Sequence, residues 1–142
     1  MFQKNLKLLR KNVNNVRLTF IIMEKPVFKF EKLIIWHKAM DFGENVFETT
    51  LGFPKEELYS LTSQLRRAVD SIALNIAEGS TGQSNPEHKK FIGYGIRSLA
   101  EVVTCLHKAK RRKYITDEKF NIQYAEAFYL MNMMASFRSK IR

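Results

Sequence analysis

Residues 64–79, with the sequence QLRRAVDSIALNIAEG, constrain the fold because they predict a helix with three different faces. At about 100° per residue, one arc is apolar and consists of Leu61, Leu65, Ala68, Ile72 and Ile76. Beside it runs a polar stripe of Gln64, Arg67, Ser71, Asn75 and Glu78. A third side carries the small residues Ala73 and Ala77 together with Arg66 and Asp70. We therefore expect this helix to be contacted from more than one side.

The polar stripe has two interpretations, a binding groove and a packing network. The network is favoured because polar groups near a core are usually hydrogen-bonded. Arg67 and Glu78 lie too far apart along one helix to pair with each other, so their partners should come from another helix or another subunit. We predict that the stripe and Gly79 are structural or subunit-interface residues, with Gly79 ending the helix as a left-handed C′ residue.

Three further helices are predicted, at about 31–50, 86–113 and from 117 onward, and the central helix extends over about 55–78. Pro54 is expected at the first position of that helix, Asn85 as the cap before Pro86, and Thr116 as the cap before Asp117. No segment alternates with the period of a strand. Short loops between long helices favour an all-α fold, an up-down-up-down antiparallel four-helix bundle.

The expected buried faces follow from the positions of the larger apolar residues. The glycines Gly93 and Gly95 inside a helix predict the close approach of a neighbouring backbone. In the first helix the buried face should consist of Leu33, Trp36, Met40, Phe47 and Leu51, widened by Phe42 and Val46. In the last helix it should consist of Phe120, Tyr124, Ala127, Met131, Met134 and Ile141, broadened by Phe128, Leu130 and Phe137.

The length of 142 residues suits one domain, and residues 26–142 are expected to form it. Residues 1–25 are expected to be a basic extension, either a loose arm or a segment upstream of a start at Met23. Half of the net charge of +10 comes from residues 1–22, which contain five cations and no acid. The apolar run at 18–23 is too short to span a membrane. The single cysteine, Cys105, favours a cytoplasmic protein.

Several sequence blocks together resemble one family. They begin at Phe30 (FxxLxxWxxA), at Phe53 (FPxxE), at Gln64 (QLRRA), at Ser71 (SIxxNIAEG) and at Ser98 (SLxE). The chain resembles the bacterial four-helix-bundle proteins encoded by intervening sequences within 23S rRNA genes, over roughly residues 28–140. Two positions depart from the family pattern. Gln83 stands where an arginine is usual, and Arg97 stands where a glycine is usual.

The resemblance implies an antiparallel four-helix bundle that assembles as a homopentamer and has no enzymatic activity. A related branch, the accessory variability determinants of diversity-generating retroelements, has the same architecture. Proteins of that branch bind nucleic acid and a reverse transcriptase through a basic surface. The resemblance therefore implies RNA, DNA or a reverse transcriptase as partners. The bulk and charge of Arg97 put a local helix or subunit contact of the family in question.

A run of cations at the end of the third helix is the candidate nucleic-acid site. It consists of Lys108, Lys110, Arg111, Arg112 and Lys113, to which Arg66 is added from the central helix. The alternative is that these cations only complement the negative end of the helix. A symmetric oligomer would repeat the run as a ring, which favours nucleic acid held by its phosphates.

Catalysis has little support in the sequence. The three histidines, His37, His88 and His107, show no metal-ligand spacing, and no pair of Glu-x-x-His motifs occurs. We expect no metal, no cofactor and no membrane association. Two other functions remain as alternatives, an assembly or adaptor module for a protein partner and, with less support, a nuclease.

Overall fold

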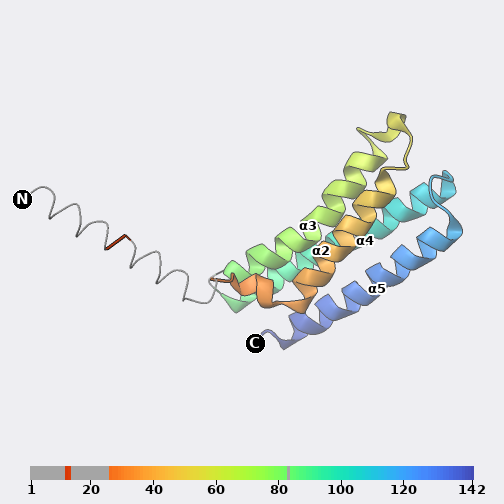
Figure 1. Cartoon of the computed structure of the whole chain (residues 1–142). Helices are drawn as coiled ribbons and strands as arrows, with labels where there is room; N and C mark the ends of the chain where they lie inside the picture. The colour runs from red at the N-terminus through yellow and green to blue at the C-terminus, as the bar shows by residue number, and fades with distance from the viewer. Residues whose placement is uncertain (1–11, 14–25, 83) are drawn as a thin grey trace, which may run out of the picture.

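The computed structural model describes residues 12–13, 26–82 and 84–142 (Figure 1). Four long helices dominate it, and no strand occurs in these residues. They are α2 (Ile34–Thr50), α3 (Leu61–Thr81), α4 (Asn85–Arg111) and α5 (Asp117–Lys140), with short 3₁₀ helices η1 (Lys29–Lys32) and η2 (Lys55–Glu57). The expectations for residues 1–11, 14–25 and Gln83 lie outside the described residues.

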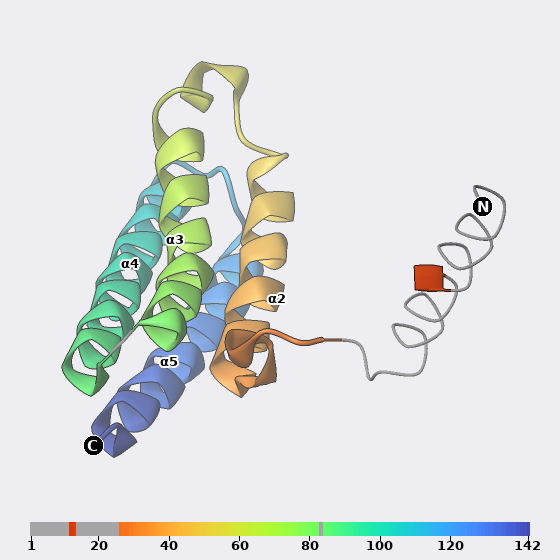
Figure 2. The same cartoon turned by 90° about the vertical axis from the view of Figure 1, so that its left-hand side faces the viewer.

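The helices form an antiparallel bundle in which each runs opposite to the one before it (Figures 1 and 2). Helix α3 packs on both α2 and α4, and α5 closes the bundle against α4 and α2. The backbones of the diagonal pairs, α2 with α4 and α3 with α5, are not in close contact in the described part of the chain. The predicted all-α four-helix bundle is confirmed.

The core is formed by apolar side chains from all four helices, and part of the predicted core is wrong. In α2 the inward positions are Ile35, Ala39, Phe42 and Val46. The expected core residues Met40, Phe47 and Leu51 are exposed, as are Tyr124 and Phe128 of α5. Both helices carry apolar residues over a wide arc, so the sequence does not say which part of the arc faces the neighbours. Packing against the neighbouring helices selects the buried part of each arc, which includes large side chains such as Phe42 and Met134.

Three helix ends differ from the sequence-based expectation. Pro54 precedes the 3₁₀ helix η2 instead of opening α3, which begins only at Leu61. Gly79 is not a left-handed C′ residue; it lies inside α3, which continues to Thr81. The cap of α4 is Ser84 rather than Asn85, and its side chain accepts a hydrogen bond from the Glu87 amide at 3.3 Å.

The glycines of α3 and α4 explain how closely these helices pack. A Cβ added at Gly79 would lie 2.9 Å from the Cβ of Phe91, and one at Gly95 would lie 3.6 Å from the backbone oxygen of Ile72. The nearest neighbour of such a Cβ at Gly95 is the methyl group of Met134 at 2.7 Å, so a side chain rather than a neighbouring backbone makes the closest approach there. Gly93 instead faces the guanidinium of Arg138.

Candidate nucleic-acid interface

The predicted basic site lies where α4 ends and the chain turns into α5. Lys113 has a φ of 59°, the left-handed conformation, and its amide donates to the Lys110 carbonyl at 3.0 Å. The Tyr114 amide reaches back to the Ala109 carbonyl at 2.9 Å. This is the Schellman arrangement, in which a left-handed residue ends the helix. The turn is completed by Thr116, whose hydroxyl accepts from the Lys119 amide at 3.1 Å, confirming Thr116 as the predicted cap.

The turn shapes a hollow of about 540 Å³, and three of its six lining residues are cations. It brings together His107, Lys110, Arg111 and Lys113, with Asp117 as the acidic member. The Lys110 ammonium lies 3.6 Å from an Asp117 carboxylate oxygen and 4.5 Å from the Phe120 ring centre. Arg111 and Lys113 are exposed, and neither forms an ion pair within the described residues.

Arg112 is the member of the run that the fold uses as an anchor. Its guanidinium lies 2.9 Å from a carboxylate oxygen of Glu57, which also accepts from the Tyr114 hydroxyl at 2.8 Å. The other Glu57 oxygen accepts from the Ser60 hydroxyl and the Leu61 amide. These hydrogen bonds, with the nearby charge of Arg112, lower the pKa of Glu57 to about 2. The hydrogen bond between Tyr114 and Glu57 also raises the pKa of Tyr114, because the tyrosine hydroxyl donates its proton to the carboxylate.

Arg66 lies apart from this turn, on the side of α3 that faces α2. Its Nε donates to the Thr50 hydroxyl at 2.8 Å, and its guanidinium lies 4.5 Å from the Phe47 ring centre. The side chain therefore braces α3 against α2, and a nucleic-acid role for it stays a prediction.

The polar stripe of α3 runs along the outer edge of the contact with α4. Gln64 donates to Glu101 of α4 at 3.4 Å, whereas Ser71 and Asn75 donate to carbonyls of their own helix. Arg67 and Glu78 are exposed, and no side-chain hydrogen bond or ion pair joins either to another described residue. The network within one chain is thus partial, and its extension to a second subunit stays a prediction.

Sequence reasoning missed a row of cations on the outer face of α4. Lys90, Arg97 and Arg111 follow a seven-residue spacing with Thr104 between them, and all are exposed. Seven residues are two helical turns, so the row is nearly straight and spans about 31 Å. Lys108 lies on the same face, and no cation of the row forms an ion pair in the described part of the chain. The seven-residue spacing is the signal that could have found it.

Comparison with known protein families shows which family the chain belongs to. Residues 31–136 match the family model described as the 23S rRNA-intervening sequence protein. The chain belongs to the 23S rRNA-intervening sequence protein family. No curated protein matches it in sequence. Arg97, which departs from the family pattern, points away from the bundle into the cationic row, so the charge does not disturb helix packing within this chain.

Other titratable groups of this family member are scattered. His37 bonds to the Glu31 carbonyl at 2.6 Å, His88 packs against Phe137, and His107 packs against Phe120. Burial lowers the pKa of His88, and it raises the pKa of the Cys105 thiol. Within 12–13, 26–82 and 84–142, no three His, Cys, Asp or Glu side chains are grouped so that they could hold a metal ion. None of the described helices is long and apolar enough to span a bilayer.

Proposed function

We propose that this protein is a non-enzymatic homo-oligomer that binds RNA or DNA through the cations at the C-terminal end of α4. The observation that carries the proposal is the group of exposed cations Lys108, Arg111 and Lys113 around one turn, none of which forms an ion pair with another described residue. Cations that served only the helix end would not need to project into a shared hollow. Lys90 and Arg97 extend the same charge along α4, in a geometry suited to successive phosphates.

The backbone at Lys113 adds support of a different kind. A left-handed conformation costs a residue with a side chain about 1–2 kcal/mol, and glycine is the usual residue at this position of a helix end. A lysine at this position forgoes stability that glycine would provide, and it supplies a charge. Such strain is typical of residues that serve a function.

The test is the binding of a labelled RNA hairpin and of a DNA duplex as a function of salt. The variant Lys108→Gln/Arg111→Gln/Lys113→Gln removes the unpaired cations but leaves the Arg112–Glu57 and Lys110–Asp117 ion pairs intact. We expect it to reduce the slope of log K against log salt by about 2–3, because each phosphate contact contributes nearly one unit.

The matched control is Lys29→Gln/Lys32→Gln/Lys140→Gln, which lowers the net charge equally but changes exposed lysines outside α4. It should bind almost as the wild type does. Equal slopes for the two triple variants would contradict the proposal. Cleavage of the labelled RNA, with or without divalent metal, would contradict the non-enzymatic part of it.

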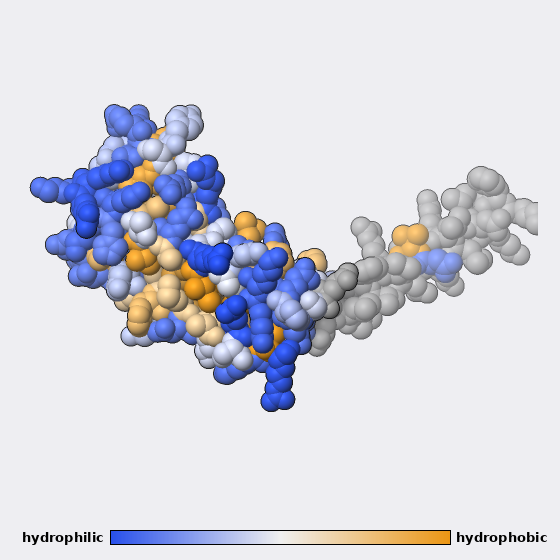
Figure 3. Space-filling model, turned by 180° about the vertical axis from the view of Figure 1, so that it is seen from behind, coloured by the Kyte–Doolittle hydropathy of each residue, from blue (hydrophilic) through white to orange (hydrophobic). Residues whose placement is uncertain are grey.

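The homo-oligomer, for which the resemblance implies a pentamer, is supported by the outer face of α5. Between Asn121 and Phe137 the only charged residue is Glu126. Phe128 is 55% exposed on the side of α5 toward α4, and Tyr129 is 68% exposed on the side toward α2. Apolar residues gather over the middle of the rear face of the bundle (Figure 3). Uncovered apolar patches of this kind mark interaction surfaces.

The same face of α5 supports a second candidate function, an assembly or adaptor module for a protein partner such as a reverse transcriptase. Under this alternative the bundle would not bind nucleic acid, even at about 50 mM salt. For either function, the support for a reducing, cytoplasmic setting is the lone buried thiol of Cys105.

A further inference from the structure

An exposed tyrosine, Tyr59, lies at the cationic end of the bundle. It belongs to the turn between η2 and α3, and it is 92% exposed. Its side chain forms no hydrogen bond, ring contact or cation–π contact with another described residue. Leaving an aromatic ring of this size in water forgoes the stabilisation that burial would give, and exposed tyrosines are accordingly frequent in binding surfaces.

The turn that carries Tyr59 is fixed by the residues on either side of it. The Glu57 carboxylate lies 2.9 Å from the Arg112 guanidinium and accepts from the Tyr114 hydroxyl at 2.8 Å. Its second oxygen accepts from the Leu61 amide at 3.2 Å, which closes the chain around Tyr59. A ligand that stacks on this ring would therefore lose little free energy to ordering of the turn.

Contacts between neighbouring elements place Tyr59 alongside the C-terminal part of α4. Two residues before it, Glu57 pairs with Arg112. Five residues after it, Gln64 donates to Glu101 of α4 at 3.4 Å. The α2–α3 loop and the α4–α5 turn lie at the same end of the bundle (Figure 1). The exposed ring and the proposed phosphate-binding cations are therefore neighbours on one end of the molecule.

A second tyrosine lies within the cationic row of α4. Tyr94 is 37% exposed, and it follows Lys90 by four residues and precedes Arg97 by three, so these side chains share one face of the helix. The Lys90 ammonium lies 5.7 Å from the Tyr94 ring centre. The half-buried Phe91 ring packs against Tyr94 with 5.8 Å between the ring centres. Cations and aromatic rings thus occur together along this face of α4.

This combination distinguishes a single strand from a duplex. In a duplex the bases stack on one another, so a tyrosine on a protein surface meets phosphates and groove edges but no free base face. Single strands are bound by surfaces that combine cations for the phosphates with aromatic rings on which unpaired bases stack. Cations alone would serve either form of nucleic acid, whereas the tyrosines favour the single strand.

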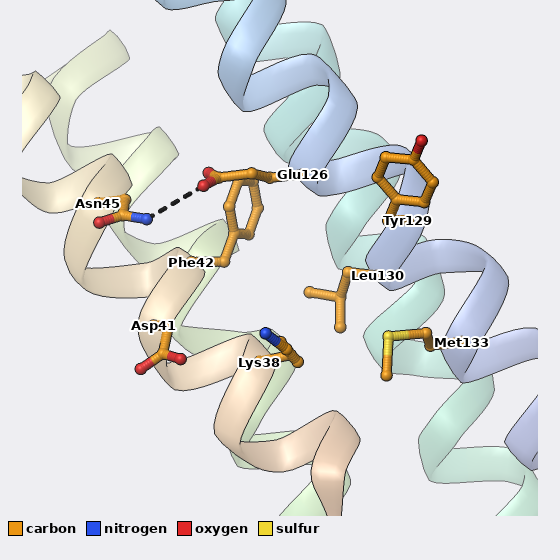
Figure 4. A pocket seen from close by; sticks show the side chains of 8 residues that line it. All are labelled: Lys38, Asp41, Phe42, Asn45, Glu126, Tyr129, Leu130 and Met133. Carbon is orange, nitrogen blue, oxygen red and sulfur yellow. Dashed lines mark hydrogen bonds between the residues drawn. The ribbon is translucent and has the colours of Figure 1, made fainter.

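The α2–α5 side of the bundle carries an exposed tyrosine in the opposite electrostatic setting. Tyr129 is 68% exposed there, beside a hollow of about 550 Å³ (Figure 4). The carboxylates of Asp41 and Glu126 line the same hollow together with Lys38 (Figure 4). Carboxylates repel phosphates, so we do not expect Tyr129 to contact a nucleic acid.

We propose that the nucleic acid held by the α4 cations is single-stranded and that Tyr59 and Tyr94 stack on its unpaired bases. The inference rests on the proposed function, because phosphate contacts to Lys90, Arg97 and Lys108 supply the electrostatic attraction. The tyrosines carry no charge, so they add affinity for unpaired bases without adding to the salt dependence of binding.

The probes are a labelled oligouridylate of about 12 nucleotides, within the site sizes of single-strand binding modules, and an RNA duplex of the same length. Electrostatics alone favours the duplex, because its phosphates are more densely spaced. We expect the full chain to bind the oligouridylate more tightly than the duplex at about 50 mM salt.

Tyr59→Ala and Tyr94→Ala should each weaken oligouridylate binding by at least about fivefold, the lower end of what one stacked base contributes. Neither variant should change duplex binding or the slope of log K against log salt. Tyr59→Phe, which keeps the ring, should bind as the wild type does.

Tyr129→Ala is the matched control, because it removes an exposed tyrosine from the side of the bundle that carries the carboxylates, and it should bind as the wild type does. Circular dichroism and sedimentation of each variant separate a lost base contact from a lost fold or assembly. Oligothymidylate of the same length distinguishes the two nucleic acids. Weaker binding than that of oligouridylate would assign RNA and equal binding would assign either one, and both results agree with stacking on unpaired bases.

The outcomes also separate this inference from the proposed function. Tighter binding of the duplex, or unchanged oligouridylate binding by both Tyr59→Ala and Tyr94→Ala, would overturn the stacking of unpaired bases and leave the proposed function standing. Failure of both probes to bind the wild type would overturn the two together.

Discussion

Lys113 has a left-handed backbone conformation that glycine would adopt at a lower free-energy cost. Replacing it therefore tests whether the lysine serves nucleic-acid binding at the expense of folding stability. We predict that Lys113→Gly stabilises the fold by about 1 kcal/mol, because the left-handed conformation costs glycine little. The same variant should weaken nucleic-acid binding, because a cation is lost from the turn. Urea unfolding and salt-dependent binding measure the two effects.

Lys113→Ala is the matched control, since it removes the charge but keeps the strain. It should weaken binding as much as Lys113→Gly does without raising stability. If Lys113→Gly left binding unchanged, the turn would have to be regarded as structural only.

Glu57 links stability to acid pH. Its pKa falls from an ordinary value of 4.5 to about 2 in the folded state, so the folded protein binds fewer protons in this range. Its contribution is complete above about pH 4.5 and is lost as the pH falls toward 2. We predict that Glu57→Gln is less stable than the wild type at pH 7 and that the difference narrows at pH 3, as measured by urea unfolding.

Glu56→Gln, which changes the exposed neighbouring acid, is the control and should leave this pH dependence almost unchanged. A difference between Glu57→Gln and the wild type that stayed constant from pH 7 to pH 3 would exclude the titration of Glu57 as its cause.

At the scale of elements, the contact between α3 and α4 depends on glycine for close approach. A methyl group at Gly79 would meet Phe91 at 2.9 Å and the His88 carbonyl at 3.3 Å, so the helices would have to move apart. We predict that Gly79→Ala destabilises the bundle by about 1–2 kcal/mol, the overpacking cost less the gain in helix propensity. Thermal or urea unfolding measures this loss.

Gly43 of α2 is the matched control, because an added Cβ there would have no neighbour within 4 Å. Gly43→Ala should stabilise the bundle by about 0.5–1 kcal/mol through helix propensity alone. Stabilisation by both substitutions would show that the α3–α4 contact can accommodate a methyl group at Gly79 without moving the helices apart.

At the scale of the whole molecule, the uncharged face of α5 predicts assembly. We expect the protein to sediment as a homo-oligomer and Phe128→Glu to dissociate it, because a charge on an apolar interface must be desolvated. The helix content of Phe128→Glu should equal that of the wild type, because Phe128 is exposed in the single chain.

Ile34→Glu places the same charge on an exposed residue at the start of α2 and should not dissociate the oligomer. A wild-type protein that sediments as a monomer, or a Phe128→Glu variant that remains assembled, would contradict assembly through α5. In that case the face would be available to another protein.

The candidate site was predictable in part. The run at 108–113 could be found because cations close in sequence remain close at a helix end. The row containing Lys90 and Arg97 has a seven-residue spacing that is visible in the sequence, but only the structure shows that these side chains are exposed. The anchoring role of Arg112 could not be found, because its partner Glu57 lies 55 residues earlier and only packing of the helices brings them within 2.9 Å.

The sequence by itself determined the number of helices, their approximate extents and the Thr116 cap, because helical periodicity and capping depend on residues within a few positions of one another. The tertiary structure alone decided that Val46 and not Phe47 is buried in α2, and that Gly79 packs against α4 instead of ending a helix. It also decided that Glu126 keeps one carboxylate oxygen buried, without a donor among the described residues. These outcomes depend on which helices meet and how closely, a property of residues far apart in the chain.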